Sequence, residues 1–109
     1  MKTLVIHPSD RTTTFLEAVY STVPDKTVVT GGVSKQELIR MVQTHDRIMM
    51  MGHGSPFGLL SVGQFPGSGM YIVDNTFAPC LRNKQNCVFI WCYAAKFVEA
   101  HDLNGWYSD

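Results

Sequence analysis

Short apolar segments alternate along the chain with segments whose apolar residues recur at helical spacing. Residues 48–51 are apolar throughout, which is typical of a central strand in a parallel sheet that is covered on both faces, and residues 3–6 form a second short, mostly apolar run. Ser34 and Glu37 predict a capping box at the start of a helix. The whole pattern predicts strands at 3–6, 27–30, 48–51 and 87–91, and helices at 13–22, 34–45, 77–83 and 94–101. In the first helix, Phe15, Leu16, Val19 and Tyr20 are expected to face the core.

A second kind of pattern interrupts this alternation after residue 51. Residues 59–62 and 70–73 have strand-like composition, and the turn sequence Pro66-Gly67-Ser68-Gly69 lies between them. We expect these two runs to form a β-hairpin. Since crossover connections between parallel strands are right-handed, the four main strands are expected in the order 2-1-3-4. The predicted fold is an α/β three-layer sandwich with a mostly parallel four-stranded sheet and a small hairpin.

Composition narrows the class of protein. The 109 residues are enough for one domain, 1–109, and the nine basic residues balance the nine acidic ones. No basic cluster indicates nucleic-acid binding, and no apolar run is long enough to cross a membrane. Three cysteines without Cys-x-x-Cys spacing fit reduced thiols in a cytoplasmic protein. The glycine fingerprints of dinucleotide and phosphate-binding loops are also absent, so we expect no cofactor.

Three reactive side chains follow predicted strands directly. His7 follows the first, His53 the third and Cys92 the fourth, so parallel strands would bring all three to the carboxyl edge of the sheet. A thiol attacks as the thiolate, and both an imidazole and a helix N-terminus lower the pKa of a neighbouring thiol. Cys92 lies at a strand-to-helix junction, and His53 lies between two glycines, Gly52 and Gly54. This arrangement predicts a His53–Cys92 dyad, with backbone N–H groups of Gly54 and Cys92 available to an oxyanion.

These residues resemble the caspase-like cysteine peptidases. The similarity lies in a strand that ends in His-Gly, at residues 48–54, and a later strand that ends in Cys before small residues, at 87–94. The resemblance implies that Cys92 is the nucleophile and His53 its acid–base partner in peptide-bond hydrolysis. It also implies a peptide or protein substrate, for which His7 and Arg11 in the loop after the first strand are candidate binding residues. Because the family's sheet continues beyond this helix, the chain corresponds to a minimal relative, an inactive one or a fragment that lacks the last third.

Other interpretations remain open at this point. Cys80 and Cys87 have no helper group in the pattern and are expected to be structural. A zinc site built from His7, His53 and Cys92 is conceivable, although no two of them share a short spacing. The main alternative function is a non-catalytic binding or regulatory module, either an inactive caspase-like relative or a flavodoxin-like one. Finally, the apolar strand at 87–91 would leave an open sheet edge, which we expect to be closed by residues 106–107 or by a second copy of the chain.

Overall fold

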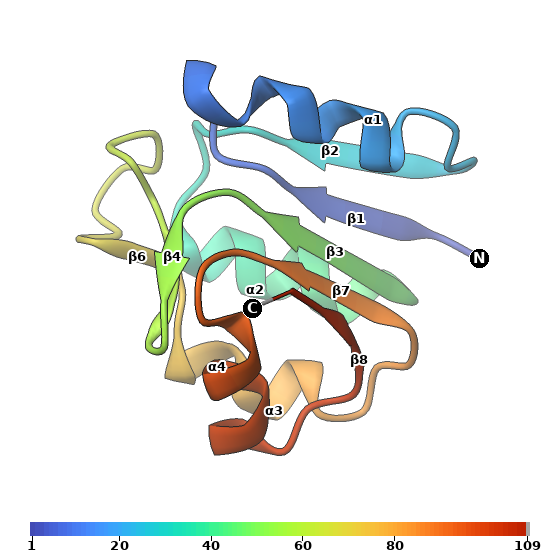
Figure 1. The fold of residues 1–109 in the computed structure, drawn as a ribbon. Coiled ribbons are helices and arrows are strands. Elements are labelled where there is room, and N and C mark those ends of the chain that lie inside the picture. Colours follow the sequence, from blue (N-terminus) through green and yellow to red (C-terminus); the bar gives the residue numbers. More distant parts are fainter. Residues whose placement is uncertain (109) are drawn as a thin grey trace.

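A five-stranded parallel sheet forms the centre of the protein (Figure 1). The structure is a computed structural model, and it describes residues 1–108. The strands lie in the order β2-β1-β3-β7-β8, and their bounds are β1 (Thr3–Ile6), β2 (Lys26–Val29), β3 (Arg47–Met51), β7 (Cys87–Ile90) and β8 (Gly105–Tyr107). The predicted order of the first four strands is confirmed. The fifth strand pairs with β7 in parallel, so residues 105–107 fold back to cover the edge that the sequence left open.

A small antiparallel sheet stands beside the large one. Its strands are β4 (Gly54–Ser55), β5 (Gly58–Leu60) and β6 (Tyr71–Val73), in the order β4-β5-β6. The predicted hairpin corresponds to β5 and β6. The additional strand β4 is formed by residues directly after His53, which the sequence pattern assigned to a turn.

Helices cover both faces of the large sheet and complete a three-layer α/β sandwich. On one face, η1 (Arg11–Leu16) and α1 (Glu17–Tyr20) pack over Val5, Met49 and Met51. On the other, the helices α2 (Lys35–Thr44), η2 (Asn75–Phe77), α3 (Ala78–Leu81) and α4 (Ala94–His101) cover a larger apolar core (Figure 1). That core includes the fully buried Leu4, Ile6, Met50, Phe77, Phe89 and Phe97.

The first predicted helix differs from its expected form. It begins as a 3-10 helix and has only one α-helical turn, because the backbone N–H and side chain of Thr13 and the side chain of Thr14 all bond back to the carbonyl of Asp10. Because a 3-10 helix has three residues per turn, a given residue points in a different direction from the one that it would have in an α-helix. Phe15 therefore points outward and is 74% exposed, contrary to the prediction that it faces the core.

No helix in residues 1–108 is both long enough and apolar enough to span a membrane. The longest, α2, has 10 residues.

Candidate functional site

The loops after β1, β3 and β7 meet at the carboxyl edge of the sheet. From β1, the chain adds β2 on one side of the sheet, and it then adds β3, β7 and β8 on the other side. The switch point of the sheet therefore lies between β1 and β3. In open parallel sheets such a switch point is where ligands bind. His7, His53 and Cys92 follow the three strands that surround it, as the sequence predicted.

The loops after β3 and β7 are fixed against each other. The Gly52 N–H donates to the Ile90 carbonyl at 3.0 Å, and the Trp91 indole N–H donates to the Ser55 carbonyl at 2.9 Å. A Cβ added to Gly54 would lie 2.2 Å from Cδ1 of Trp91. The packing of Trp91 therefore explains the glycine at position 54 without a role for its N–H group in catalysis.

His53 is bonded to the loop after β1. Its Nε2 lies 2.6 Å from the Thr12 hydroxyl and 3.5 Å from Oδ2 of Asp10, while the His53 side chain is 45% exposed. Asp10 in turn accepts from the Thr12 N–H at 2.8 Å and from the Thr12 hydroxyl at 2.7 Å. These hydrogen bonds from Thr12, the hydroxyl foremost and then the N–H, lower the pKa of Asp10, so the carboxylate is ionised at neutral pH. We call Asp10, Thr12 and His53 the edge cluster.

The edge cluster selects one tautomer of His53. An ionised Asp10 can only accept, so the Thr12 hydroxyl uses its proton on the carboxylate and its oxygen accepts from His53. His53 therefore carries a proton on Nε2. In the neutral ring Nδ1 is then the acceptor, and it has no hydrogen-bond partner within the described residues.

Cys92 is exposed at the adjacent strand end, in the turn that leads into α4. No hydrogen bond joins its thiol to His53 within residues 1–108, so the two side chains are not a bonded pair in this structure. Tyr93, which precedes α4, has a left-handed backbone (φ 64°) and is 61% exposed. The N–H groups of Cys92 and Tyr93 donate to no acceptor in the described chain. Among the residues that the structure describes, they are two unpartnered donors just before a helix.

His7 takes no part in this exposed surface. It is 5% exposed, its Nδ1 lies 2.8 Å from the Tyr20 hydroxyl, and its Nε2 lies 3.2 Å from the Thr13 hydroxyl. Burial lowers the pKa of His7 and so favours the neutral ring. Its two nitrogens are used inside the fold, and the structure gives it a role in holding η1 and α1 to β1 rather than in contacting a ligand.

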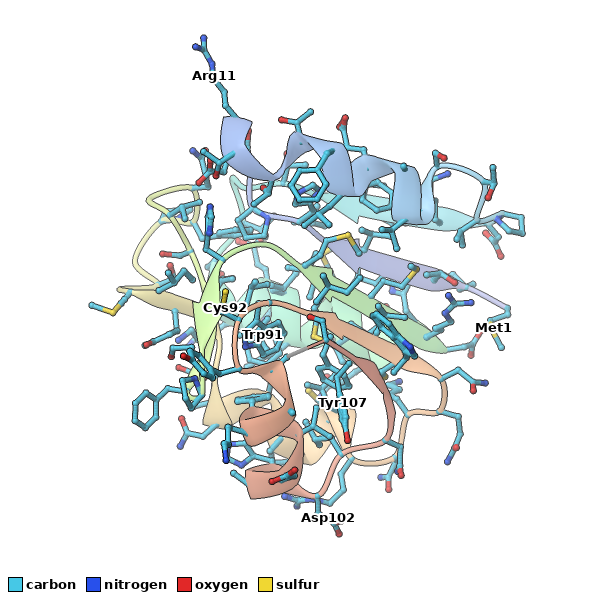
Figure 2. All side chains as sticks on the ribbon, in the orientation of Figure 1. Met1, Arg11, Trp91, Cys92, Asp102 and Tyr107 are labelled. Carbon is cyan, nitrogen blue, oxygen red and sulfur yellow. The ribbon has the colours of Figure 1, made fainter. Side chains whose placement is uncertain are left out.

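Arg11 also lies apart from the other candidates. It is exposed at the start of η1 and extends away from Cys92 into solvent (Figure 2). The structure therefore brings His53 and Cys92 to adjacent loops, and it separates Arg11 and His7 from them.

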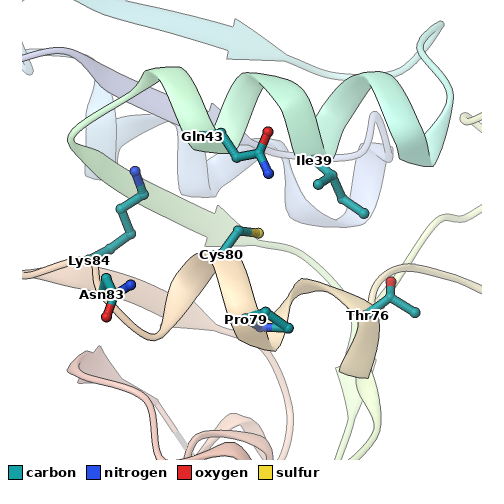
Figure 3. A pocket seen from close by; sticks show the side chains of 7 residues that line it. All are labelled: Ile39, Gln43, Thr76, Pro79, Cys80, Asn83 and Lys84. Carbon is teal, nitrogen blue, oxygen red and sulfur yellow. The ribbon is translucent and has the colours of Figure 1, made fainter.

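The other two cysteines are structural. Cys87 is fully buried, and the Cys80 thiol donates to the Phe77 carbonyl at 3.1 Å. Burial raises the pKa of both thiols. Cys80 lies at a hollow of about 470 Å³ between α2 and α3 (Figure 3). No three His, Cys, Asp or Glu side chains in residues 1–108 are grouped to hold a metal ion, and the zinc site considered from His7, His53 and Cys92 is not formed.

Comparisons with known proteins bear on the fold. No family model matches the chain, and no curated protein matches it either. Among solved structures, the chain is similar to a crystal structure described as a protein (NADPH-quinone reductase) from P. pentosaceus, with a TM-score of 0.50 and 16% sequence identity. The match covers 100% of this chain and 82% of that chain. When the five strands of the large sheet in the present protein are numbered in chain order, they lie in the order 2-1-3-4-5, which is the strand order of flavodoxin. The fold is flavodoxin-like.

This finding corrects the family inferred from the sequence. The assignment to the caspase-like cysteine peptidases is wrong, and the prediction of hydrolase and peptidase activity that rested on it is wrong as well. The physical reason is that many α/β folds share alternating strands and helices, so His-Gly and Cys at strand ends do not distinguish one from another. The flavodoxin-like fold named in the alternative interpretation fits the structure better than the caspase-like one.

A flavodoxin-like fold raises the question of flavin mononucleotide, which flavodoxin binds at its switch point. A phosphate there would need free N–H or hydroxyl donors at the start of the first helix. In this chain Asp10 occupies that position. Its carboxylate accepts a hydrogen bond from the Thr12 N–H, and its backbone carbonyl accepts one from the Thr13 N–H. The hydroxyls of Thr12, Thr13 and Thr14 also bond to Asp10. An ionised carboxylate that uses these donors would repel a phosphate, so the residues present do not fit the flavin group.

Sequence reasoning missed Asp10 and Thr12 as members of the site. Asp followed two residues later by Thr is an N-cap signal that could have placed Asp10 at the start of a helix. Nothing in the pattern links that cap to His53, which is 41 residues from Thr12 along the chain.

Proposed function

We propose that this chain is a flavodoxin-like binding module that takes an amide-bearing ligand, such as an extended peptide segment, at the carboxyl edge without hydrolysing it. The edge cluster carries the proposal, because it holds His53 with Nε2 protonated and leaves Nδ1 as an acceptor that has no partner within residues 1–108. The Cys92 and Tyr93 N–H groups on the adjacent loop donate to no acceptor within residues 1–108. An amide offers the complement of this set, with one N–H to donate and one carbonyl to accept.

The charge of the edge supports this ligand class over a nucleotide. Asp10 is ionised and lies 3.5 Å from Nε2 of His53, and its side chain is 25% exposed, so a phosphate at this edge would meet a negative charge. A neutral amide does not incur that repulsion. For the same reason, the proposal does not include the activity in the name of the P. pentosaceus protein.

The proposal can be tested by NMR titration of the whole chain with acetyl-trialanine amide and, separately, with flavin mononucleotide. We expect the peptide to shift the amide signals of His53, Cys92 and Tyr93, and flavin mononucleotide to leave them unchanged. In His53→Ala the ligand loses one hydrogen bond, so the peptide affinity should fall about fivefold. Arg11→Gln, at an exposed residue that points away, is the control and should bind as the parent does. Saturable flavin binding at this edge, or equal peptide affinity in His53→Ala, would overturn the proposal.

A further inference from the structure

A second hollow of about 630 Å³ lies between the small sheet and α4, and none of the edge cluster or Cys92 lines it. Its walls are Pro56 and Phe57 from the β4–β5 turn, Tyr71 from β6, and Lys96 and His101 from α4. A volume in this range is typical of pockets that hold small molecules.

The backbone of the turn that forms the apolar wall of this hollow is held by hydrogen bonds. Phe57 is 71% exposed, yet its N–H donates to the Ser55 hydroxyl at 3.0 Å, and that hydroxyl lies 2.7 Å from the Tyr71 hydroxyl. Gly58 follows with φ 145°, where an added Cβ would lie 2.0 Å from the Val73 carbonyl oxygen. These contacts fix the backbone of the turn, which places the exposed side chain of Phe57 beside the hollow. An apolar group that covers this ring gains burial without the entropic cost of ordering the turn.

The opposite wall carries positive charge. Lys96 is exposed, and its ammonium forms no ion pair or hydrogen bond within residues 1–108. The acidic residue in the lining, Asp74, is already paired with Lys35 at 2.6 Å. A ligand in the hollow thus faces an unpaired ammonium and a neutralised carboxylate. This combination attracts an anion and disfavours a cation.

We propose that the hollow binds a small apolar carboxylic acid, with the carboxylate at Lys96 and the apolar body against Phe57 and Tyr71. The observation that decides between anion and cation is the pairing of Asp74 by Lys35. This site is independent of the carboxyl edge, so it can fail or succeed without affecting the proposed function.

The test compares phenylacetate with phenethylamine, which share an aromatic ring and have opposite charges, by NMR titration of the whole chain. We expect phenylacetate to shift the signals of residues 56–57, 71 and 96–101, and phenethylamine to bind at least fivefold more weakly. Lys96→Gln and Phe57→Ala should each lower phenylacetate affinity at least threefold. Two matched controls should leave it unchanged: Arg40→Gln removes an exposed cation from α2, and Phe15→Ala removes an equally exposed ring from η1.

Three outcomes would overturn this inference. The first is equal affinity for the acid and the amine, which would leave only the aromatic ring as a determinant. The second is a Lys96→Gln affinity equal to that of the parent protein. The third is a set of shifted signals confined to His53, Cys92 and Tyr93, which would assign the acid to the carboxyl edge instead.

Discussion

The three thiols show how burial sets chemistry at the scale of single residues. Cys87 has no exposed surface and Cys80 donates to a backbone carbonyl, whereas Cys92 is exposed at a loop. Burial raises the pKa of Cys80 and Cys87, and a higher pKa leaves less of the reactive thiolate at neutral pH. Cys92 is thus the accessible thiol of the three.

We predict that iodoacetamide labels Cys92 at least tenfold faster than Cys80 or Cys87 at neutral pH, because reaction needs both access and thiolate. Mass spectrometry of peptides at successive times would give the three rates. Cys92→Ser should remove the fast phase, and labelling in denaturant should make the remaining two thiols equal. Similar rates for all three in the folded protein would show that Cys92 is protected in solution.

For single residues, the sequence predicts where a side chain lies in the fold better than it predicts the hydrogen-bond partners of that side chain. The placement of His53 and Cys92 at one edge follows from strand ends, which an apolar run reveals. The bond between His53 and Thr12 depends on the path of two loops, and no local pattern encodes that path. His7 shows the same limit, because a strand-end histidine looks alike in sequence whether its ring faces solvent or, as here, Tyr20.

Among the elements, a single ion pair joins α2 to η2. Lys35 is the first residue of α2, and its ammonium lies 2.6 Å from Asp74, which caps η2 by accepting from the Thr76 N–H at 3.0 Å. Burial by itself would raise the pKa of Asp74, but the hydrogen bonds from Lys35 and Thr76 outweigh it and lower that pKa. The ionised carboxylate therefore stabilises the fold.

We predict that Lys35→Gln lowers the free energy of unfolding by about 0.5–1 kcal/mol at neutral pH, a small value because both side chains remain partly in water. The folded-state pKa of Asp74 is depressed, so its contribution is present above the unfolded-state value of about 3.9 and is lost as the pH falls through the folded value. The difference between Lys35→Gln and the parent should shrink as the pH is lowered from 7 toward 3. Urea unfolding at several pH values measures it, with Arg40→Gln as the control. A difference that does not change with pH would mean that Asp74 is not the partner that matters.

Element prediction succeeded where packing follows the apolar pattern and failed where local hydrogen bonds or very short length intervene. The helix predicted at 94–101 has the bounds of α4, with Phe97 and Val98 buried. Strand β4 has only two residues, too few to show a period of two. The pairing of residues 106–107 with the open edge, one of the two closures expected from the sequence, is present as β8. In the segment after β1, the bonds to Asp10 override helical spacing and turn Phe15 outward.

For the whole molecule, the handedness of crossovers was the most informative rule. It supported the order of four strands before any contact was known, because right-handed connections leave only a few possible strand orders. It could not give the family, since the same order of elements serves unrelated chemistry. The family error therefore arose from assigning a family from the order of elements and two strand ends, at residues 48–54 and 87–94, rather than from a wrong sheet.

The two edges of the sheet differ in how they are protected. At one edge, β2 begins with Lys26, a residue type that discourages strand pairing between molecules. At the other, β8 has no charged residue, and Trp106 and Tyr107 are 62% and 40% exposed. An uncharged, aromatic edge strand is open to pairing with another chain.

We predict that two copies associate through β8 around a two-fold axis, which would join their sheets into one with antiparallel β8 strands at the centre. Size-exclusion chromatography with light scattering should then give a mass that rises from monomer to dimer with concentration. Trp106→Lys places a charge at this edge and should shift the protein to monomer, whereas Val28→Lys, at the β2 edge, should not. If the parent chain stays monomeric at every concentration, the β8 edge does not pair in solution, and the exposed aromatic residues need another explanation.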